Sequence, residues 1–243
     1  MRILAHRGSP DTTSIENTVP AVSTALAAYA DGAEVDLRLS ADGILVACHD
    51  ADLARLTGRR LVVADTPWAG LRATADACGV PLARLEWLLA AAGGRPLVLE
   101  LKPGPARIAE VLVERLVHLH TVGLPMDVTV SSFDPVLLRA FRLTAPAYLQ
   151  VRTALLGDSG CLPLAVLRQA LRDGHDEVQP HVSDLLGGPH CVATAHSCGV
   201  AVVPWTVNSR RAVRRCADLG VDAVITDVPA TVRLALAARP AAA

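Results

Sequence analysis

Three observations predict an α/β fold, a (β/α)8 TIM barrel. Eight short β-type runs alternate along the chain with eight longer helical runs. The length, 243 residues, is the size at which eight such units form one barrel. No GxGxxG turn follows the first strand, which disfavours the alternative of a doubly wound open sheet.

The predicted strands come first in each unit. They span residues 2–6, 32–39, 96–102, 127–132, 147–153, 176–182, 200–207 and 222–228. The predicted helices lie between them and span residues 17–30, 82–92, 105–121, 135–144, 162–172, 188–198, 209–219 and 228–238. Pro135 directly after Asp134 is a helix start signal, and glycines such as Gly174 and Gly220 stand where helices should stop.

One segment departs from this alternation and predicts a β-hairpin after the second strand. Asp42-Gly43 is a strong two-residue turn signal. With that turn, His49 returns to the end of the second strand and lies directly across from Asp36. A three-residue loop would shift the pairing by one position.

Composition indicates one ordered domain. Hydrophobic residues make up 51% and charged residues 19%, which supports a large core and excludes a disordered chain. No linker divides the sequence, so residues 1–238 are expected to form a single barrel domain, with 239–243 a frayed tail.

Charge and cysteine usage limit the partners and the compartment. The net charge is −1 without a basic patch, and aromatic residues are only 3%, so we expect no nucleic-acid partner. No apolar run is long enough for stable insertion into a membrane, and the first residues do not form a secretion signal. None of the six cysteines forms a CxxC motif, so a cytoplasmic setting is expected. A homo-oligomer stays open.

Unusual polar residues gather where the first three barrel strands end. They are His6, Arg7, Glu34, Asp36, His49, Glu100 and Lys102. Active sites of these barrels form at the carboxyl ends of the strands, so these side chains are expected to meet at one mouth. Each residue alone is compatible with a structural role, but unpaired charges beside such apolar flanks are costly, so together they favour a functional site.

The residue types indicate the chemistry. Glu34, Asp36 and Glu100 offer hard oxygen ligands, which suit one divalent cation, Mg²⁺ or Ca²⁺. Arg7 and Lys102 can balance the negative charge and bind an anion, and a phosphate is the anion we expect. Two histidines can act as base and acid, so the set predicts phosphoryl chemistry. Lys102 is the only lysine of the chain, which suggests a specific requirement for an ammonium group there.

The sequence resembles the glycerophosphodiester phosphodiesterase family in ordered pieces that span almost the whole chain. The most specific pieces are AHRG at 5–8, GAEVDLRLSADGILVACHD at 32–50 and LVLELK at 97–102. The supporting pieces are ENT at 16–18, SSFDP at 131–135, WTVN at 205–208 and GVDAVITDVPA at 220–230.

The resemblance implies hydrolysis of a small-molecule phosphodiester, a glycerophosphodiester, to sn-glycerol 3-phosphate and an alcohol. It implies that His6 and His49 are the acid–base pair, that Glu34, Asp36 and Glu100 bind the divalent ion, and that Arg7 and Lys102 bind phosphate. Trp205 then borders the glycerol or leaving-group pocket. The attacking group, water or the glycerol 2-hydroxyl, stays open.

Members of that family often carry a small insertion over the mouth between the second and third strands. Here the stretch from His49 to Glu100 is shorter and leaves residues 58–79 as a short cover segment, in which Trp68 is expected to be structural. A wide mouth leaves open a lysophospholipase D-like activity on lysolipids. A separate alternative is a catalytically idle barrel that binds phosphorylated ligands, and the presence of both histidines and all three carboxylates argues against it.

Overall fold

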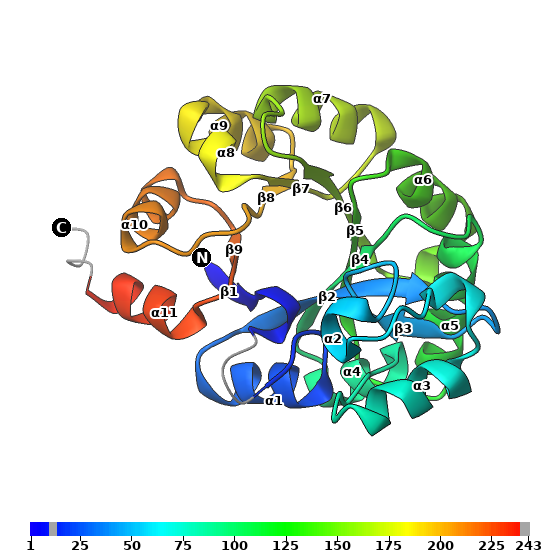
Figure 1. Ribbon diagram of the computed structural model, residues 1–243. Helices are drawn as coiled ribbons and strands as arrows, with labels where there is room; N and C mark the ends of the chain where they lie inside the picture. The colour runs from blue at the N-terminus through cyan, green and yellow to red at the C-terminus, as the bar shows by residue number, and fades with distance from the viewer. Residues whose placement is uncertain (10–13, 239–243) are drawn as a thin grey trace.

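The computed structural model describes residues 1–9 and 14–238, so the predicted tail at 239–243 lies outside the described residues. Eight parallel strands form a barrel with helices around it, which confirms the predicted fold (Figure 1). Neighbouring strands follow the order β8-β7-β6-β5-β4-β2-β1-β9, and β3 pairs with β2 in antiparallel orientation.

The strands are short, and their inward and outward faces are both mostly buried. They are β1 (Arg2–Ala5), β2 (Gly32–Leu39), β3 (Leu45–Ala47), β4 (Pro96–Leu101), β5 (Asp127–Ser132), β6 (Arg152–Gly157), β7 (Glu177–Pro180), β8 (Ala201–Val202) and β9 (Ala223–Thr226). Backbone hydrogen bonds from Asp222 to Val202, from Ile225 to Pro204 and from Val207 to Ile225 bring the last strand against the β8 region.

The helices surround the strands. They are α1 (Val19–Ala28), α2 (Ala54–Thr57), α3 (Trp68–Ala77), α4 (Leu85–Ala92), α5 (Ile108–Thr121), α6 (Pro135–Thr144), α7 (Pro163–Asp173), α8 (Val182–Gly187), α9 (His190–Ser197), α10 (Arg210–Leu219) and α11 (Pro229–Ala237), with 3-10 turns η1 (His6–Gly8), η2 (Val63–Asp65) and η3 (Ala147–Leu149). Buried Val, Leu and Ala side chains from strands and helices form one large core between the two layers. None of these described helices has both the length and the hydropathy that a membrane span requires.

The predicted strand at residues 147–153 was wrong in position. Residues 147–149 form η3, Gln150 adopts a left-handed conformation with φ of 48°, and β6 begins only at Arg152. The left-handed residue interrupts the apolar run, and the strand uses the following residues, which are buried from Thr153 to Gly157.

The predicted hairpin is present, but its register differs by one residue from the two-residue turn. Leu39 pairs with Leu45 and Leu37 with Ala47, so the loop has three residues, 41–43. Gly43 makes this loop possible because its φ of 82° lies in the left-handed region, where glycine carries no steric penalty. Cys48, not His49, is therefore the residue opposite Asp36, and its amide donates a hydrogen bond to the Asp36 carbonyl.

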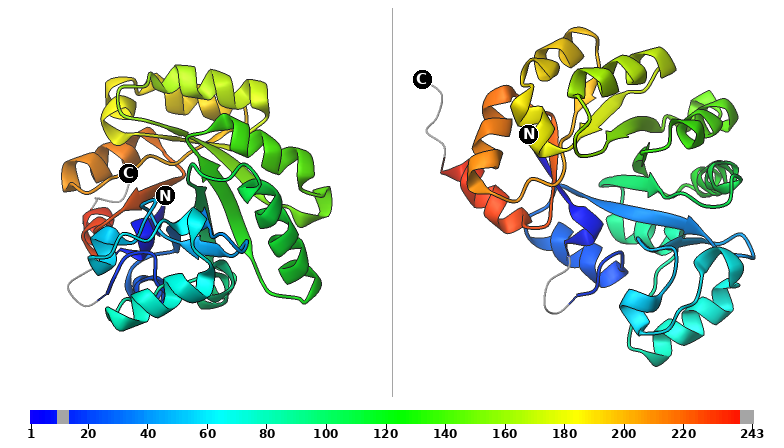
Figure 2. Two further views of the ribbon diagram at one scale, coloured as in Figure 1. Left: turned by 45° about the vertical axis from the view of Figure 1, so that its right-hand side comes forward. Right: turned by 45° about the horizontal axis from the view of Figure 1, so that its top comes forward.

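The cover segment between β3 and α4 has a small core of its own. Buried side chains from Leu53, Val63 and Leu71 pack together there, with Trp68 against them. Trp68 also meets Trp87 edge to face with ring centroids 5.7 Å apart, which agrees with a structural role. The segment carries α2 and α3, which lie in one sector of the ring beside α4 (Figure 2).

Candidate active site

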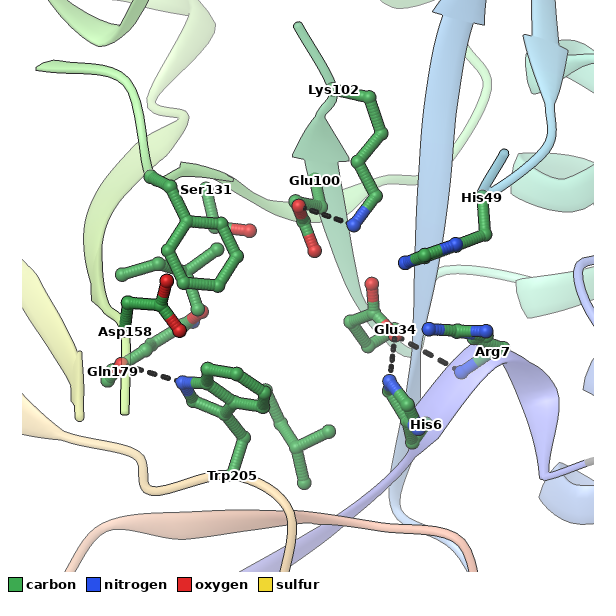
Figure 3. Close-up of a pocket in the computed structure, with 13 residues that line it drawn as sticks. His6, Arg7, Glu34, His49, Glu100, Lys102, Ser131, Asp158, Gln179 and Trp205 are labelled. Atoms are coloured by element: carbon green, nitrogen blue, oxygen red, sulfur yellow. Dashed lines mark hydrogen bonds and ion pairs between the residues drawn. The ribbon is translucent and has the colours of Figure 1, made fainter. Parts of the chain in front are cut away.

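A cavity of about 240 Å³ opens at the carboxyl ends of the barrel strands. Seven of the eight predicted site residues line it: His6, Arg7, Glu34, His49, Glu100, Lys102 and Trp205. The eighth, Asp36, lies just behind the cavity wall, where its side chain is 1% exposed. The cavity has two chemically different sides, because Arg7 and the two histidines face Ser131, Gln179 and Trp205 across it (Figure 3).

The three carboxylates meet because β2 and β4 are adjacent and parallel. Asp36 stands in register with Glu100, and Glu34 lies two residues earlier on the same face of β2. One oxygen from each lies within 4.8 Å of the others, and all three residues are buried. Such a group of oxygen donors can hold a hard divalent cation.

The electrostatics of Glu34 fit a bound cation. Its Oε2 accepts a hydrogen bond from the Arg7 amide at 3.0 Å, but its buried Oε1 has no hydrogen-bond partner among the described residues. Burial, with repulsion from Asp36, raises the pKa of Glu34 to about 8. A buried carboxylate with an unpaired oxygen requires either a proton or a positive ion.

Lys102 is the nearest positive charge to the other two carboxylates. Its Nζ lies 2.9 Å from Oδ1 of Asp36 and 2.6 Å from Oε1 of Glu100. Burial opposes the charged form of the lysine, but the two carboxylates outweigh it and raise the pKa of Lys102. Burial also raises the pKa of Glu100, with Lys102 opposing, whereas Lys102 and Arg7 overcome burial at Asp36 and lower its pKa.

Arg7 contacts the acidic group through both its backbone and its side chain. Its φ of 52° is left-handed, so the backbone amide points at Glu34 while the guanidinium extends toward Asp36 and Glu16. Nε lies 3.3 Å from Oδ2 of Asp36, and Nη1 lies 3.3 Å from Oε1 of Glu16. Asn17 fixes Asp36 further, because its amide nitrogen lies 2.7 Å from Oδ2 and its amide oxygen accepts the Asp36 N–H at 2.9 Å.

Each of the two histidines has a carboxylate on one ring nitrogen. Nδ1 of His6 lies 2.6 Å from Oδ1 of Asp227, and Nδ1 of His49 lies 2.8 Å from Oδ1 of Asp50. The second nitrogen of each ring is turned toward the cavity (Figure 3), and Nε2 of His6 lies 3.9 Å from Glu34. Burial lowers the pKa of His6, but Asp227 and Glu34 raise it above its usual value, whereas for His49 burial prevails over Asp50 and the pKa falls.

Sequence reasoning missed the partners of the histidines. Asp227 follows β9 at the far end of the chain, and Asn208 holds its second oxygen at 2.6 Å. Asp50 is held by Arg55, whose Nε lies 2.6 Å from Oδ2 of Asp50 and whose Nη2 lies 2.6 Å from Oε1 of Glu16. Four of these residues lie inside the sequence pieces that carry the family resemblance: Glu16, Asp50, Asn208 and Asp227. Strand alternation alone assigns no partner to such loop residues.

The second side of the cavity is built around Trp205. Its Nε1 donates a hydrogen bond to the backbone carbonyl of Gln179 at 3.0 Å, which fixes the indole. Phe133 and His181 meet the indole edge to face with ring centroids 5.5 Å and 5.1 Å away. His181, whose Nδ1 lies 2.7 Å from the Ser183 hydroxyl, therefore supports Trp205 from outside the cavity lining.

The chain is similar to known proteins over almost its whole length. Residues 6–231 match the family described as the Glycerophosphoryl diester phosphodiesterase family. The chain is 30% identical over 244 residues to a glycerophosphodiester phosphodiesterase of Bacillus altitudinis, covering 94% of this chain and 95% of the relative. It is 27% identical over 238 residues to another from Caldanaerobacter subterraneus subsp. tengcongensis, with the same coverage.

A solved structure shares the fold. It is a phosphodiesterase of Oleispira antarctica in complex with the product sn-glycerol-3-phosphate, with a TM-score of 0.83 and 23% identity over 98% of this chain and 97% of that one.

Proposed function

Because the chain belongs to the glycerophosphoryl diester phosphodiesterase family and is a phosphoric diester hydrolase, we propose that it hydrolyses glycerophosphodiesters to sn-glycerol 3-phosphate and an alcohol. The observation that carries the proposal is that three buried carboxylates, two positively charged side chains and two histidines, each paired with a carboxylate, converge on one cavity. The Oleispira antarctica protein, which shares the fold, was solved with this product.

In this proposal Glu34, Asp36 and Glu100 hold one divalent ion, Mg²⁺ or Ca²⁺. The unpaired Oε1 of Glu34 and its raised pKa support this assignment, as does the all-oxygen donor set. When bound, the ion supplies charge stabilisation for the phosphoryl oxygens.

Arg7 and Lys102 bind the phosphate. Both side chains line the cavity and lie against the acidic group, so a phosphate beside the ion is within reach of an ammonium and a guanidinium. These two charges also offset the negative charge of the three carboxylates, which keeps the site from repelling an anionic substrate.

His6 and His49 transfer the protons. One ring accepts the proton of the attacking hydroxyl at its free nitrogen, and the other donates a proton to the oxygen of the departing alcohol. The carboxylates on the Nδ1 atoms keep both rings oriented and determine which nitrogen faces the substrate. Trp205, held by the Gln179 carbonyl, forms the wall beside the bound diester.

A reducing, cytoplasmic setting is part of the proposal. All six cysteines are free, and this is typical of proteins in reducing compartments.

The test is release of sn-glycerol 3-phosphate from a panel of glycerophosphodiesters by the purified protein supplied with Mg²⁺ or Ca²⁺. Chelation and the His6→Ala substitution are each expected to abolish release. His196→Ala is the matched control, because His196 pairs with Asp222 on the surface. A metal-supplied protein that is inert toward the whole panel would refute the proposal.

A further inference from the structure

Two neutral polar side chains of the cavity lack partners. The hydroxyl of Ser131 and both amide atoms of Gln179 are buried and form no hydrogen bond with any other part of the chain that the structure describes. The exposed fractions of the two residues are 1% and 0%. Native proteins rarely leave such groups unpaired, and where they do, a water, ion or ligand is the usual partner.

The place of these groups ties them to the acidic side of the site. Ser131 on β5 stands in register with Glu100 on β4, so its hydroxyl borders the proposed ion position. Gln179 on β7 lies farther round the barrel, beside Trp205. Burial raises the pKa of Glu177, which lies two residues before Gln179 on β7. The side-chain amide of Gln179 acts to lower that pKa, but the two side chains are not aligned for a hydrogen bond.

The chemistry of this side differs from that of the other. His6, Arg7 and His49 lie across the cavity from Ser131 and Gln179 (Figure 3). A carboxamide offers an acceptor and two donors, and a hydroxyl offers both functions, so together they match the hydroxyl groups of a polyol. Neither of these two groups carries a charge that could balance a buried ionised ligand group, and the carboxylate of Asp158, which lies on the same side (Figure 3), can accept hydrogen bonds from hydroxyls but would repel an anion.

Apolar side chains enclose these groups. Leu156, Ile225 and the Phe133–Trp205 pair line the same cavity and reduce access of water. A hydrogen bond formed in such surroundings discriminates strongly, because a ligand lacking the hydroxyl leaves the protein group unpaired.

We infer that Ser131 and Gln179 bind the free hydroxyl groups of the glycerol moiety and select glycerol-bearing diesters from other phosphodiesters. This inference rests on the proposed function and adds the part of the substrate that is recognised. It makes Ser131 and Gln179 specificity-determining residues and places the glycerol between Glu100 and Trp205.

The test compares two diesters that differ by one hydroxyl. Glycerol 3-(4-nitrophenyl phosphate) has the complete glycerol, and 2-hydroxypropyl 4-nitrophenyl phosphate lacks only the terminal hydroxyl while keeping the 2-hydroxyl. We expect the wild-type protein to favour the first by about a hundredfold or more in kcat/KM. Gln179→Met and Ser131→Ala are each expected to reduce this preference to roughly tenfold or less, mainly through slower turnover of the glycerol diester.

Ser132→Ala is the matched control for Ser131→Ala. The Ser132 hydroxyl is equally buried but donates to the Leu101 carbonyl at 2.8 Å, so it has a structural partner. We expect Ser132→Ala to lower Tm and to keep the substrate preference. Ser131→Ala is expected to keep or raise Tm while losing the preference, because its hydroxyl has no partner to lose in the free protein.

The outcomes separate this inference from the proposed function. Equal turnover of both diesters by the wild-type protein, or an unchanged preference in both variants, overturns the role of Ser131 and Gln179 but leaves the hydrolase proposal intact. If neither diester is hydrolysed, calorimetric binding of sn-glycerol 3-phosphate against 1,2-propanediol 1-phosphate decides the inference on its own. Equal affinity for these two monoesters contradicts it.

Discussion

Nδ1 of His6 lies 2.6 Å from Oδ1 of Asp227, although 221 positions separate the two residues in the sequence. The contact forms because β1 and β9 are adjacent parallel strands, with Ala5 in register with Thr226. Asn208 holds the other oxygen of Asp227, so both oxygens of the carboxylate have a side-chain partner. A histidine whose ring nitrogen is held in this way has a defined orientation toward the cavity.

Asp227→Asn is expected to lower the pKa of His6. Burial favours the neutral ring, and the carboxylate of Asp227 opposes burial by hydrogen bond and charge, so its removal moves the pKa downward. We expect kcat/KM to fall by about a hundredfold or more, since the ring also loses its fixed tautomer. NMR titration of the His6 ring gives the pKa directly.

Asp222→Asn provides the control for this prediction. Asp222 lies 2.9 Å from His196 in an exposed pair away from the cavity. This variant should keep kcat/KM and the pKa of His6. An unchanged His6 pKa in Asp227→Asn would contradict the assigned role of the carboxylate.

Metal affinity is expected to increase with pH up to about 8. Below the pKa of Glu34, which burial raises to about 8, the carboxyl is protonated, and an incoming ion must displace that proton. The apparent affinity should fall by roughly tenfold per pH unit between pH 8 and 6. Calorimetric titration with Mg²⁺ or Ca²⁺ at pH 7, in two buffers of different ionisation enthalpy, should show release of about one proton per ion.

Glu34→Gln should bind the ion more weakly and without this proton release. An affinity independent of pH from 6 to 8 in the wild-type protein would contradict the displacement of a proton from Glu34, and an affinity unchanged in Glu34→Gln would show that Glu34 is not a ligand of the ion.

Lys102→Arg is expected to lower kcat/KM by about tenfold or more. The ammonium sits between Asp36 at 2.9 Å and Glu100 at 2.6 Å, and a planar guanidinium is too large to occupy that position without separating the two carboxylates. Arg72→Lys is the opposite exchange on the surface, where Arg72 pairs with Asp76 one helical turn away, and it should leave activity unchanged. Wild-type activity in Lys102→Arg would show that the lysine is incidental.

Arg55→Gln is expected to lower kcat/KM by roughly tenfold with little change in Tm. Arg55 contacts Asp50, which holds His49, and Glu16, which holds Arg7, so its loss loosens two site residues at once. Because its side chain is 47% exposed, the ion pairs contribute little to stability. Arg60→Gln, in the same segment but 83% exposed and paired with Asp52, should have no effect on turnover. If both variants behave alike, Arg55 does not position the site.

Local rules were sufficient to predict the acidic group. Glu34 and Asp36 share one strand face by alternation, and Glu100 with Lys102 shares another, and parallel strands bring these faces to one mouth. The positions of strands 32–39 and 127–132 agree with the structure, and helix 135–144 begins where Asp134 and Pro135 signal its start.

Features that depend on backbone conformation or on distant loops could not be predicted. The sequence left open whether the hairpin loop has two or three residues, and the three-residue loop depends on a left-handed Gly43. The delayed start of β6 follows from a left-handed Gln150, and no periodicity reveals either conformation. The left-handed Arg7 directs its amide to Glu34 in the same way. Asp227 reaches His6 only when β1 and β9 are neighbours, so its partner is a property of the closed barrel and not of any segment.

The closed barrel also gives the site an order of assembly during protein synthesis. Both histidines, the three carboxylates and Lys102 lie in the first 102 residues, but the carboxylate that orients His6 is at position 227. A chain still emerging from the ribosome therefore contains most of the proposed catalytic groups well before His6 is held in place. We expect a nascent chain to stay inactive until its last strand docks beside its first, so that hydrolysis reports completed folding.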